Sequence, residues 1–99
     1  MFILLLTYQK SLEEVDKHLA AHKVYLDKNY AAGNFIASGR RNPRIGGVIL
    51  CRASQKEVVE ELIKEDPFYA YEVAKYEILE FEPTKFTEDF DRFLEFLIQ

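Results

Sequence analysis

Two short apolar segments constrain the fold of this chain more than any other feature of its sequence. One covers residues 2–8, interrupted only at Thr7, and the other covers residues 47–51. Successive side chains of a β-strand point to opposite faces of a sheet, and in both segments both alternating sets are apolar. Each segment therefore predicts a central strand with apolar surroundings on both faces.

A long amphipathic helix is predicted after the first strand. Ser11 followed by Glu14 forms a capping box, a pairing that starts many helices. We expect the helix to run to about Ala32 and to stop at Gly33, because glycine accepts the left-handed conformation common at helix ends. The apolar stripe of this helix recurs at spacings of three and four and carries Leu12, Val15, Leu19, His22 and Leu26.

The rest of the chain predicts a hairpin, an edge strand and two further helices. Residues 35–38 and 47–51 form strands joined by the turn-rich residues 39–46, and the charged alternation of residues 73–81 is typical of an edge strand.

Two further capping signals mark these helices. Ser54 with Glu57 begins a helix that runs to Lys64, and Thr87 can cap a last helix with an acidic first turn. The apolar side of that last helix carries Phe90, Phe93, Leu94, Leu97 and Ile98.

The order of elements is β-α-β-β-α-β plus a C-terminal helix, an α+β arrangement that predicts a ferredoxin-like sandwich with an antiparallel sheet. In this fold the first and third strands are central, which agrees with the two apolar segments. We expect one domain over residues 1–99, with a core of about 1–83 and a helical extension of about 87–98. One sheet face carries no helices, so a second copy of the chain, or the last helix, is expected to cover it.

Composition limits the possible partners and compartments. The 99 residues are 48% hydrophobic and 30% charged, as in an ordinary globular domain, and the formal net charge of -4 argues against nucleic-acid binding. Cys51 is the single cysteine, so no internal disulfide can form, and a reducing compartment such as the cytoplasm is expected. The apolar residues 1–6 are too few to span a membrane and lack the charged start of a signal peptide.

His22 and Asp66 are the candidate catalytic residues. His22 lies on an apolar stripe, and Asp66 follows the end of the second helix, where its charge faces the negative pole of the helix dipole. Both helices pack on one sheet face in this fold, so the two side chains can approach. The carboxylate would then fix the tautomer of the imidazole and leave its other nitrogen for a substrate.

Each of these two residues also has a structural interpretation. His22 could be a core histidine bonded to a backbone carbonyl, and Asp66 could cap a short turn with Pro67 at its first position. His18, one turn before His22, is expected in solvent. Cys51 lies in a strand pattern without a neighbouring base and is expected in the core.

Substrate-binding candidates come from a basic loop and from polar residues near strand ends. Arg40, Arg41 and Arg44 lie in one loop and can bind a carboxylate or phosphate, although solvated loop charge is the alternative. Tyr8 and Ser38 could orient a polar ligand, and strand-end aromatic residues could equally be packing. The sequence contains no phosphate loop, dinucleotide fingerprint or metal-ligand spacing, so neither a cofactor nor a metal is expected.

With these residues the chain resembles the YciI-like family of dimeric α+β barrel proteins, over most of residues 1–83. The matching features are Thr7-Tyr8, His22, residues 33–39, Gly46-Gly47 and Asp66-Pro67-Phe68. The resemblance implies a His-Asp pair in a pocket, formed here by His22 and Asp66, and a homodimer joined through the open sheet faces.

Two positions depart from the family pattern. Leu19 stands where an arginine often precedes the histidine, and Arg40 stands where proline is frequent. These departures suggest that anion recognition has moved to the loop of Arg40 and Arg41.

The sequence and the resemblance together predict a small cofactor-free enzyme. His22 would transfer a proton on a small anionic molecule in a lyase, isomerase or dehalogenase type of reaction, and Asp66 would orient it. The alternative is a dimeric module that binds a small ligand or regulates a partner without catalysis.

Overall fold

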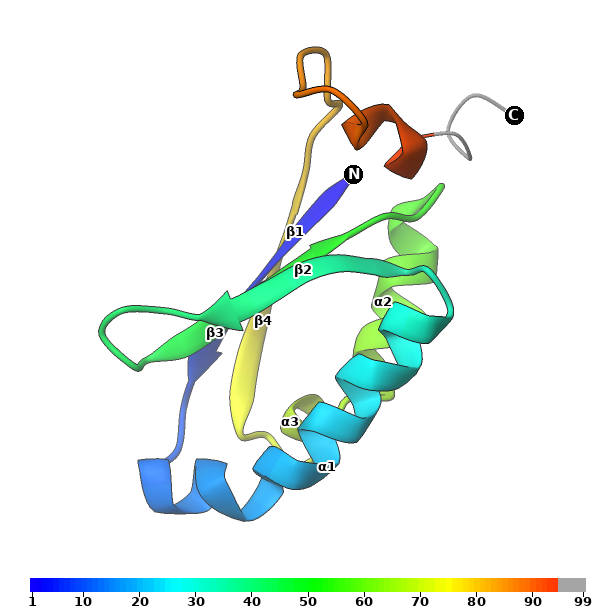
Figure 1. Ribbon diagram of the computed structural model, residues 1–99. Coiled ribbons are helices and arrows are strands. Elements are labelled where there is room, and N and C mark those ends of the chain that lie inside the picture. The colour runs from blue at the N-terminus through cyan, green and yellow to red at the C-terminus, as the bar shows by residue number, and fades with distance from the viewer. Residues whose placement is uncertain (95–99) are drawn as a thin grey trace.

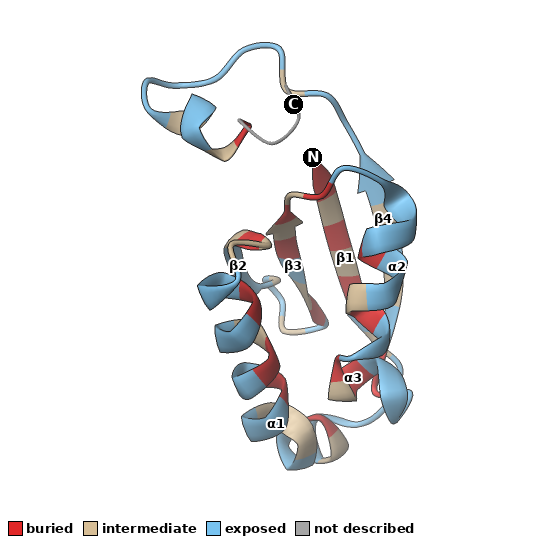
Figure 2. Cartoon of the chain, turned by 90° about the vertical axis from the view of Figure 1, so that its right-hand side faces the viewer, coloured by how far each residue is buried: buried red, intermediate tan, exposed pale blue. Residues whose placement is uncertain are grey.

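The computed structural model describes residues 1–94 of the chain (Figure 1). Four antiparallel strands form one sheet in the order β2-β3-β1-β4. Figures 1 and 2 show all three α-helices on one side of this sheet. The elements are β1 (Phe2–Tyr8), α1 (Leu12–Ala31), β2 (Phe35–Arg40), β3 (Gly46–Cys51), α2 (Lys56–Lys64), α3 (Pro67–Ala70) and β4 (Ala74–Glu80).

The two apolar segments occupy the centre of the sheet, as predicted. β1 pairs with β3 on one side and with β4 on the other, so that Leu4 lies between Ile49 and Ile78. β4 lies at the edge of the sheet, as its charged residues predict. The ferredoxin-like α+β fold expected from the order of elements is therefore confirmed.

The two faces of the sheet are covered differently. The helix side carries the buried core, in which Leu4 and Cys51 have no exposed surface. On the opposite side Ile3 and Leu5 are half-buried, and Val48 and Leu79 are 37% and 46% exposed. Residues 1–94 contain no helix that covers this second face (Figure 2).

Helix α1 begins and ends as its sequence predicts. The hydroxyl of Ser11 accepts a hydrogen bond from the backbone N–H of Glu14 at 3.3 Å. At the other end Gly33 has a φ angle of 80°, in the left-handed region that glycine tolerates. The carboxylate of Glu14 binds Lys17 at 2.9 Å.

Helix α2 starts differently from the prediction. Gln55 precedes it with an extended backbone and no side-chain cap, so the helix begins at Lys56 and Ser54 lies one position too early to cap it. β2 also runs beyond the predicted residues 35–38 to Arg40.

The predicted C-terminal helix is only partly present in the described residues. Phe90–Phe93 forms a short 3₁₀ helix, and Thr87 bonds to it through its carbonyl oxygen, which accepts from Phe90 N–H at 3.1 Å. Asp89 has a φ angle of 73°, which prevents a regular helix from starting at Thr87. Residues 95–98 of the expected helix lie outside the described residues. Figures 1 and 2 place the short helix Phe90–Phe93 beyond the end of the sheet and not over its open face.

Candidate functional site

His22 lies midway along α1 and faces the sheet. Its residue surface is 8% exposed, and its ring lies parallel to that of Phe68, with centroids 4.0 Å apart and planes 2° apart. Leu19 and Leu26 lie one turn before and after it on the same apolar stripe. The spacing of α1 therefore holds the imidazole between apolar neighbours.

Asp66 is fully buried and accepts three hydrogen bonds. Its Oδ1 accepts from Nδ1 of His22 at 2.8 Å and from the backbone N–H of Phe68 at 2.9 Å. Its Oδ2 accepts from the hydroxyl of Tyr76 on β4. Asp66 is thus both the N-cap of α3 and the hydrogen-bond partner of His22, so the turn cap and the contact predicted from the sequence are both present.

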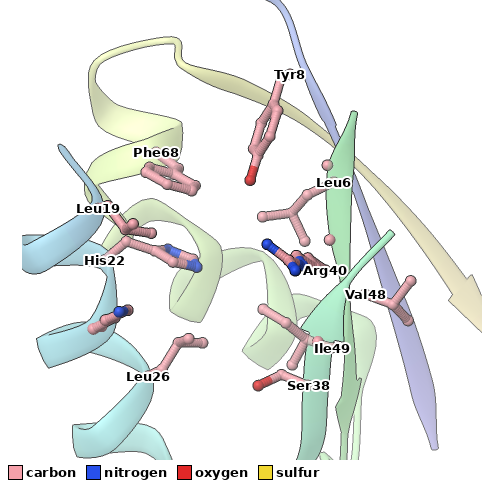
Figure 3. A pocket seen from close by; sticks show the side chains of 14 residues that line it. Leu6, Tyr8, Leu19, His22, Leu26, Ser38, Arg40, Val48, Ile49 and Phe68 are labelled. Atoms are coloured by element: carbon pink, nitrogen blue, oxygen red, sulfur yellow. The ribbon is translucent and has the colours of Figure 1, made fainter. Parts of the chain in front are cut away.

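The contact with Asp66 fixes how His22 can react. A carboxylate can only accept, so the shared proton is on Nδ1, and in the neutral imidazole the other ring nitrogen, Nε2, is an acceptor. Nε2 makes no hydrogen bond to any residue within 1–94. Figure 3 shows the imidazole directed toward a pocket, with Arg40 on the opposite wall.

This pocket has a volume of about 170 Å³ and lies between α1 and the sheet. Most of its walls are apolar side chains, and the hydroxyl of Tyr8 points into it (Figure 3). It is lined by Leu6, Tyr8, Leu19, His22, Lys23, Leu26, Ser38, Gly39, Arg40, Gly46, Gly47, Val48, Ile49 and Phe68. Three of the four predicted substrate-binding residues, Tyr8, Ser38 and Arg40, therefore lie in one pocket with His22.

The two arginines of the predicted anion-binding pair separate. Arg41 does not line the pocket; its Nη1 donates to Oγ1 of Thr7 at 3.0 Å. A β-bulge between Phe35 and Ala37 shifts the alternation of β2 by one residue, which turns Arg40 to the helix side of the sheet. Neighbouring strand residues point to opposite faces, so the bulge that places Arg40 in the pocket excludes Arg41.

Other candidate residues have structural partners. Arg44 forms an ion pair with Asp16 at 2.6 Å. His18 was expected in solvent, but it is half-buried and stacks on Tyr71 with ring centroids 4.7 Å apart. Ser38 accepts a hydrogen bond from Tyr30 at 2.6 Å, so its hydroxyl is held at the pocket wall.

Two residues of the site were missed by sequence reasoning. Lys23 follows His22 directly and lines the pocket. Tyr76 lies within the predicted edge strand, residues 73–81, and its hydroxyl forms a hydrogen bond with Asp66. The alternation of β4 could have placed Tyr76 on the helix side, because it pairs with Leu6 of the core face. The contact between Tyr76 and Asp66, ten positions earlier, has no corresponding pattern in the sequence.

Burial changes the acidity of three groups around the site. Burial first, and the charge of Asp66 second, raise the pKa of both Tyr25 and Tyr76 far above the ordinary phenol value. Both phenols therefore remain protonated donors at neutral pH. Burial also raises the pKa of the Cys51 thiol to about 11, which makes this residue an inert core side chain, as expected.

Metal binding has no candidate cluster in the described part of the chain. Residues 1–94 contain no group of three or more His, Cys, Asp or Glu side chains arranged to hold an ion.

Within residues 1–94, no helix combines the length and hydropathy needed to cross a bilayer.

The sheet, the helices on one face and the pocket between them define an α+β protein of the ferredoxin-like class. The model of the YCII-related domain matches residues 1–82. The chain therefore belongs to the YCII-related family, which confirms the resemblance drawn from its motifs.

Comparison with solved structures supports the same fold. The chain is similar to 5-chloro-2-hydroxyhydroquinone dehydrochlorinase (TftG) from Burkholderia phenoliruptrix AC1100, solved as a complex with 2,5-dihydroxybenzoquinone. The TM-score is 0.67 at 18% sequence identity, over 83% of this chain and 94% of the dehydrochlorinase. No curated protein matches the sequence.

Proposed function

We propose that this protein is a small enzyme that moves a proton on a compact anionic molecule, with Nε2 of His22 as the proton-transfer atom. One observation carries the proposal: Asp66 occupies Nδ1 of His22, while Nε2 is directed toward a pocket whose opposite wall holds Arg40. Because Asp66 already holds the imidazole in place, no further conformational entropy is lost in orienting it for reaction. A histidine held in this way is suited to act as a general base or acid.

The charges of the pocket favour an anion. Lys23 and Arg40 both line it, and neither side chain forms a hydrogen bond or an ion pair with another residue of the described chain. No carboxylate side chain is among the pocket residues within 1–94, since Asp66 lies behind His22. A carboxylate or phenolate ligand would therefore meet two available cations.

The size of the pocket favours a small ligand. Its volume of about 170 Å³ is close to the ~150 Å³ of an engineered protein cavity that binds benzene. One six-membered ring, or a chain of similar bulk, would fill it. The dihydroxybenzoquinone bound to the similar dehydrochlorinase is a molecule of this size, which supports the proposal without identifying the substrate.

The proposed reaction uses four residues of the pocket together with Asp66, which lies behind His22. Nε2 of His22 accepts a proton from an acidic C–H or O–H of the substrate, whose electron pair remains as an enolate or phenolate. Arg40 stabilises that oxyanion, and Asp66 stabilises the imidazolium. The imidazolium then returns the proton to another atom, in an isomerisation, or to a departing group, in an elimination. Tyr8 and Ser38 orient the polar groups of the substrate.

A second copy of the chain is proposed to cover the open sheet face. Val48 and Leu79 are partly exposed there beside the half-buried Ile3 and Leu5. At about 25 cal/mol per Å² of apolar area, burying several hundred Å² of this face would supply on the order of 10 kcal/mol before the costs of association. The homodimer predicted from the sequence is consistent with this surface.

A thermal-shift screen of small ring and short-chain carboxylates and phenolates tests the proposal. We expect a compound that stabilises the unaltered protein and loses this effect in Arg40→Met and Lys23→Met. Lys28→Met is the matched control, because Lys28 lies on α1 outside the pocket and pairs with Glu65.

Turnover of the compound distinguishes an enzyme from the alternative module that binds without catalysis. His22→Gln should abolish turnover while leaving binding through Arg40 largely intact. A ligand that stabilises His22→Ala, Asp66→Asn and Arg40→Met as well as it stabilises the unaltered protein would contradict the proposed site.

A further inference from the structure

A hydroxyl on the edge strand completes the hydrogen bonding of the His-Asp pair. Tyr76 lies on β4, and its hydroxyl donates to Oδ2 of Asp66, the oxygen that His22 does not use. We propose that Tyr76 is a positioning residue of the site, which holds the Asp66 carboxylate in one orientation and thereby fixes the tautomer and ring plane of His22. The inference rests on the proposed function, in which His22 transfers the proton.

The carboxylate is held on both of its oxygens. Oδ1 accepts from His22 and from the backbone of Phe68, and Oδ2 accepts from Tyr76. Asp66 has no exposed surface, so water is not available to replace a missing donor. Rotation of the carboxylate would break at least one of these bonds. By holding the plane of the carboxylate, Tyr76 therefore also holds the position of Oδ1, the atom to which Nδ1–H of His22 donates.

The hydroxyl of Tyr76 is suited to this role over a wide pH range. Burial and the neighbouring charge of Asp66 raise the pKa of Tyr76, so the phenol keeps its proton and remains a donor. Its ring also packs edge-on against Tyr69, with centroids 6.3 Å apart. These contacts connect β4 to a pocket that it does not line.

A second buried tyrosine provides a matched control. The ring of Tyr25 lies 6.2 Å from that of His22, and its hydroxyl donates to the carbonyl of Leu62 at 2.8 Å. Tyr25→Phe, like Tyr76→Phe, removes one phenol hydroxyl near His22, but it leaves all three donors of Asp66 in place. An effect of Tyr76→Phe on His22 that Tyr25→Phe does not share therefore acts through Asp66.

The experiment is ¹⁵N NMR of the imidazole nitrogens in the full chain without ligand. We expect the Nδ1–H tautomer of His22 in the unaltered protein and in Tyr25→Phe. In Tyr76→Phe the tautomer ratio should move about tenfold toward Nε2–H, which corresponds to about 1.4 kcal/mol. An unchanged ratio in Tyr76→Phe, or the same change in both variants, would overturn the proposal.

A second measurement needs no Tyr76 variant. In the unaltered protein the Tyr76 hydroxyl proton should exchange slowly with solvent, because it is bonded to a buried carboxylate. Rapid exchange of this proton would also overturn the proposal. Neither measurement uses a ligand, so a pocket that binds no small anion would contradict the proposed function and leave these NMR results standing.

Discussion

The imidazole of His22 and the phenyl ring of Phe68 lie face to face, 4.0 Å between centroids and 2° between planes. The backbone N–H of Phe68 donates to the same Asp66 oxygen that accepts from His22. Phe68 thus packs against the histidine and donates to Asp66, which caps α3 and is bonded to the same histidine. The three residues form one unit at the wall of the pocket.

Asp66→Asn should destabilise the protein strongly. The amide keeps one acceptor oxygen and places an NH₂ group where a donor now points, so at least one buried group loses its partner. We expect a loss of about 3 kcal/mol in the free energy of unfolding, measured with urea. Glu65→Gln is the matched control; its exposed ion pair with Lys28 should contribute less than about 1 kcal/mol. Equal stabilities of the two variants would contradict the burial of Asp66.

The buried phenol of Tyr76 should lower the free energy of unfolding at alkaline pH. Its pKa is raised in the folded protein, so above about pH 10 the unfolded chain releases a proton that the folded chain retains. This contribution is fully present below pH 10 and is lost as the pH rises, by up to about 1.4 kcal/mol per pH unit. Urea unfolding between pH 9 and about 11.5 should show the decline, and Tyr76→Phe should make it shallower. The same slope in the variant would count against a protonated, buried phenol.

Cys51 should be slow to react in the folded protein. Burial raises its pKa to about 11, so at pH 8 the thiol is neutral as well as inaccessible. Iodoacetamide should modify it at least about tenfold more slowly in buffer than in denaturing urea. Mass spectrometry measures the two rates, and equal rates would show that Cys51 is not in the core.

The open sheet face predicts a homodimer. Light scattering at micromolar concentration should give twice the protomer mass of 11.6 kDa. Val48→Asp places a charge on this face and should shift the mass toward the protomer. Val24→Asp is the control, because Val24 is 69% exposed on α1, on the opposite side of the sheet. Loss of the dimer in the control and not in Val48→Asp would locate the interface elsewhere.

The sequence was sufficient to predict the elements that depend on local patterns. The two apolar segments identified the central strands, and Ser11 marked the start of α1. The contact of His22 with Asp66 could also be predicted, because this fold places both helices on one face of the sheet. Its catalytic use remains a prediction.

Features that depend on long-range geometry could not be predicted. A single bulge in β2 decides that Arg40, and not Arg41, reaches the pocket. Tyr76 reaches Asp66 only because β4 pairs with β1 in one register. The left-handed backbone of Asp89 overrides an apolar pattern that otherwise favours a helix from Thr87.

The most direct test of the central claim follows Nε2 of His22 during a ligand titration. The ligand is the small carboxylate or phenolate that gives the largest thermal shift in the screen, and the observable is the ¹⁵N chemical shift of each ring nitrogen. We predict that the Nε2 resonance moves with ligand concentration while Nδ1 stays bonded to Asp66, and that Arg40→Met weakens the response. A ligand that saturates the protein without moving Nε2 would contradict the account, as would a screen in which no small anion binds.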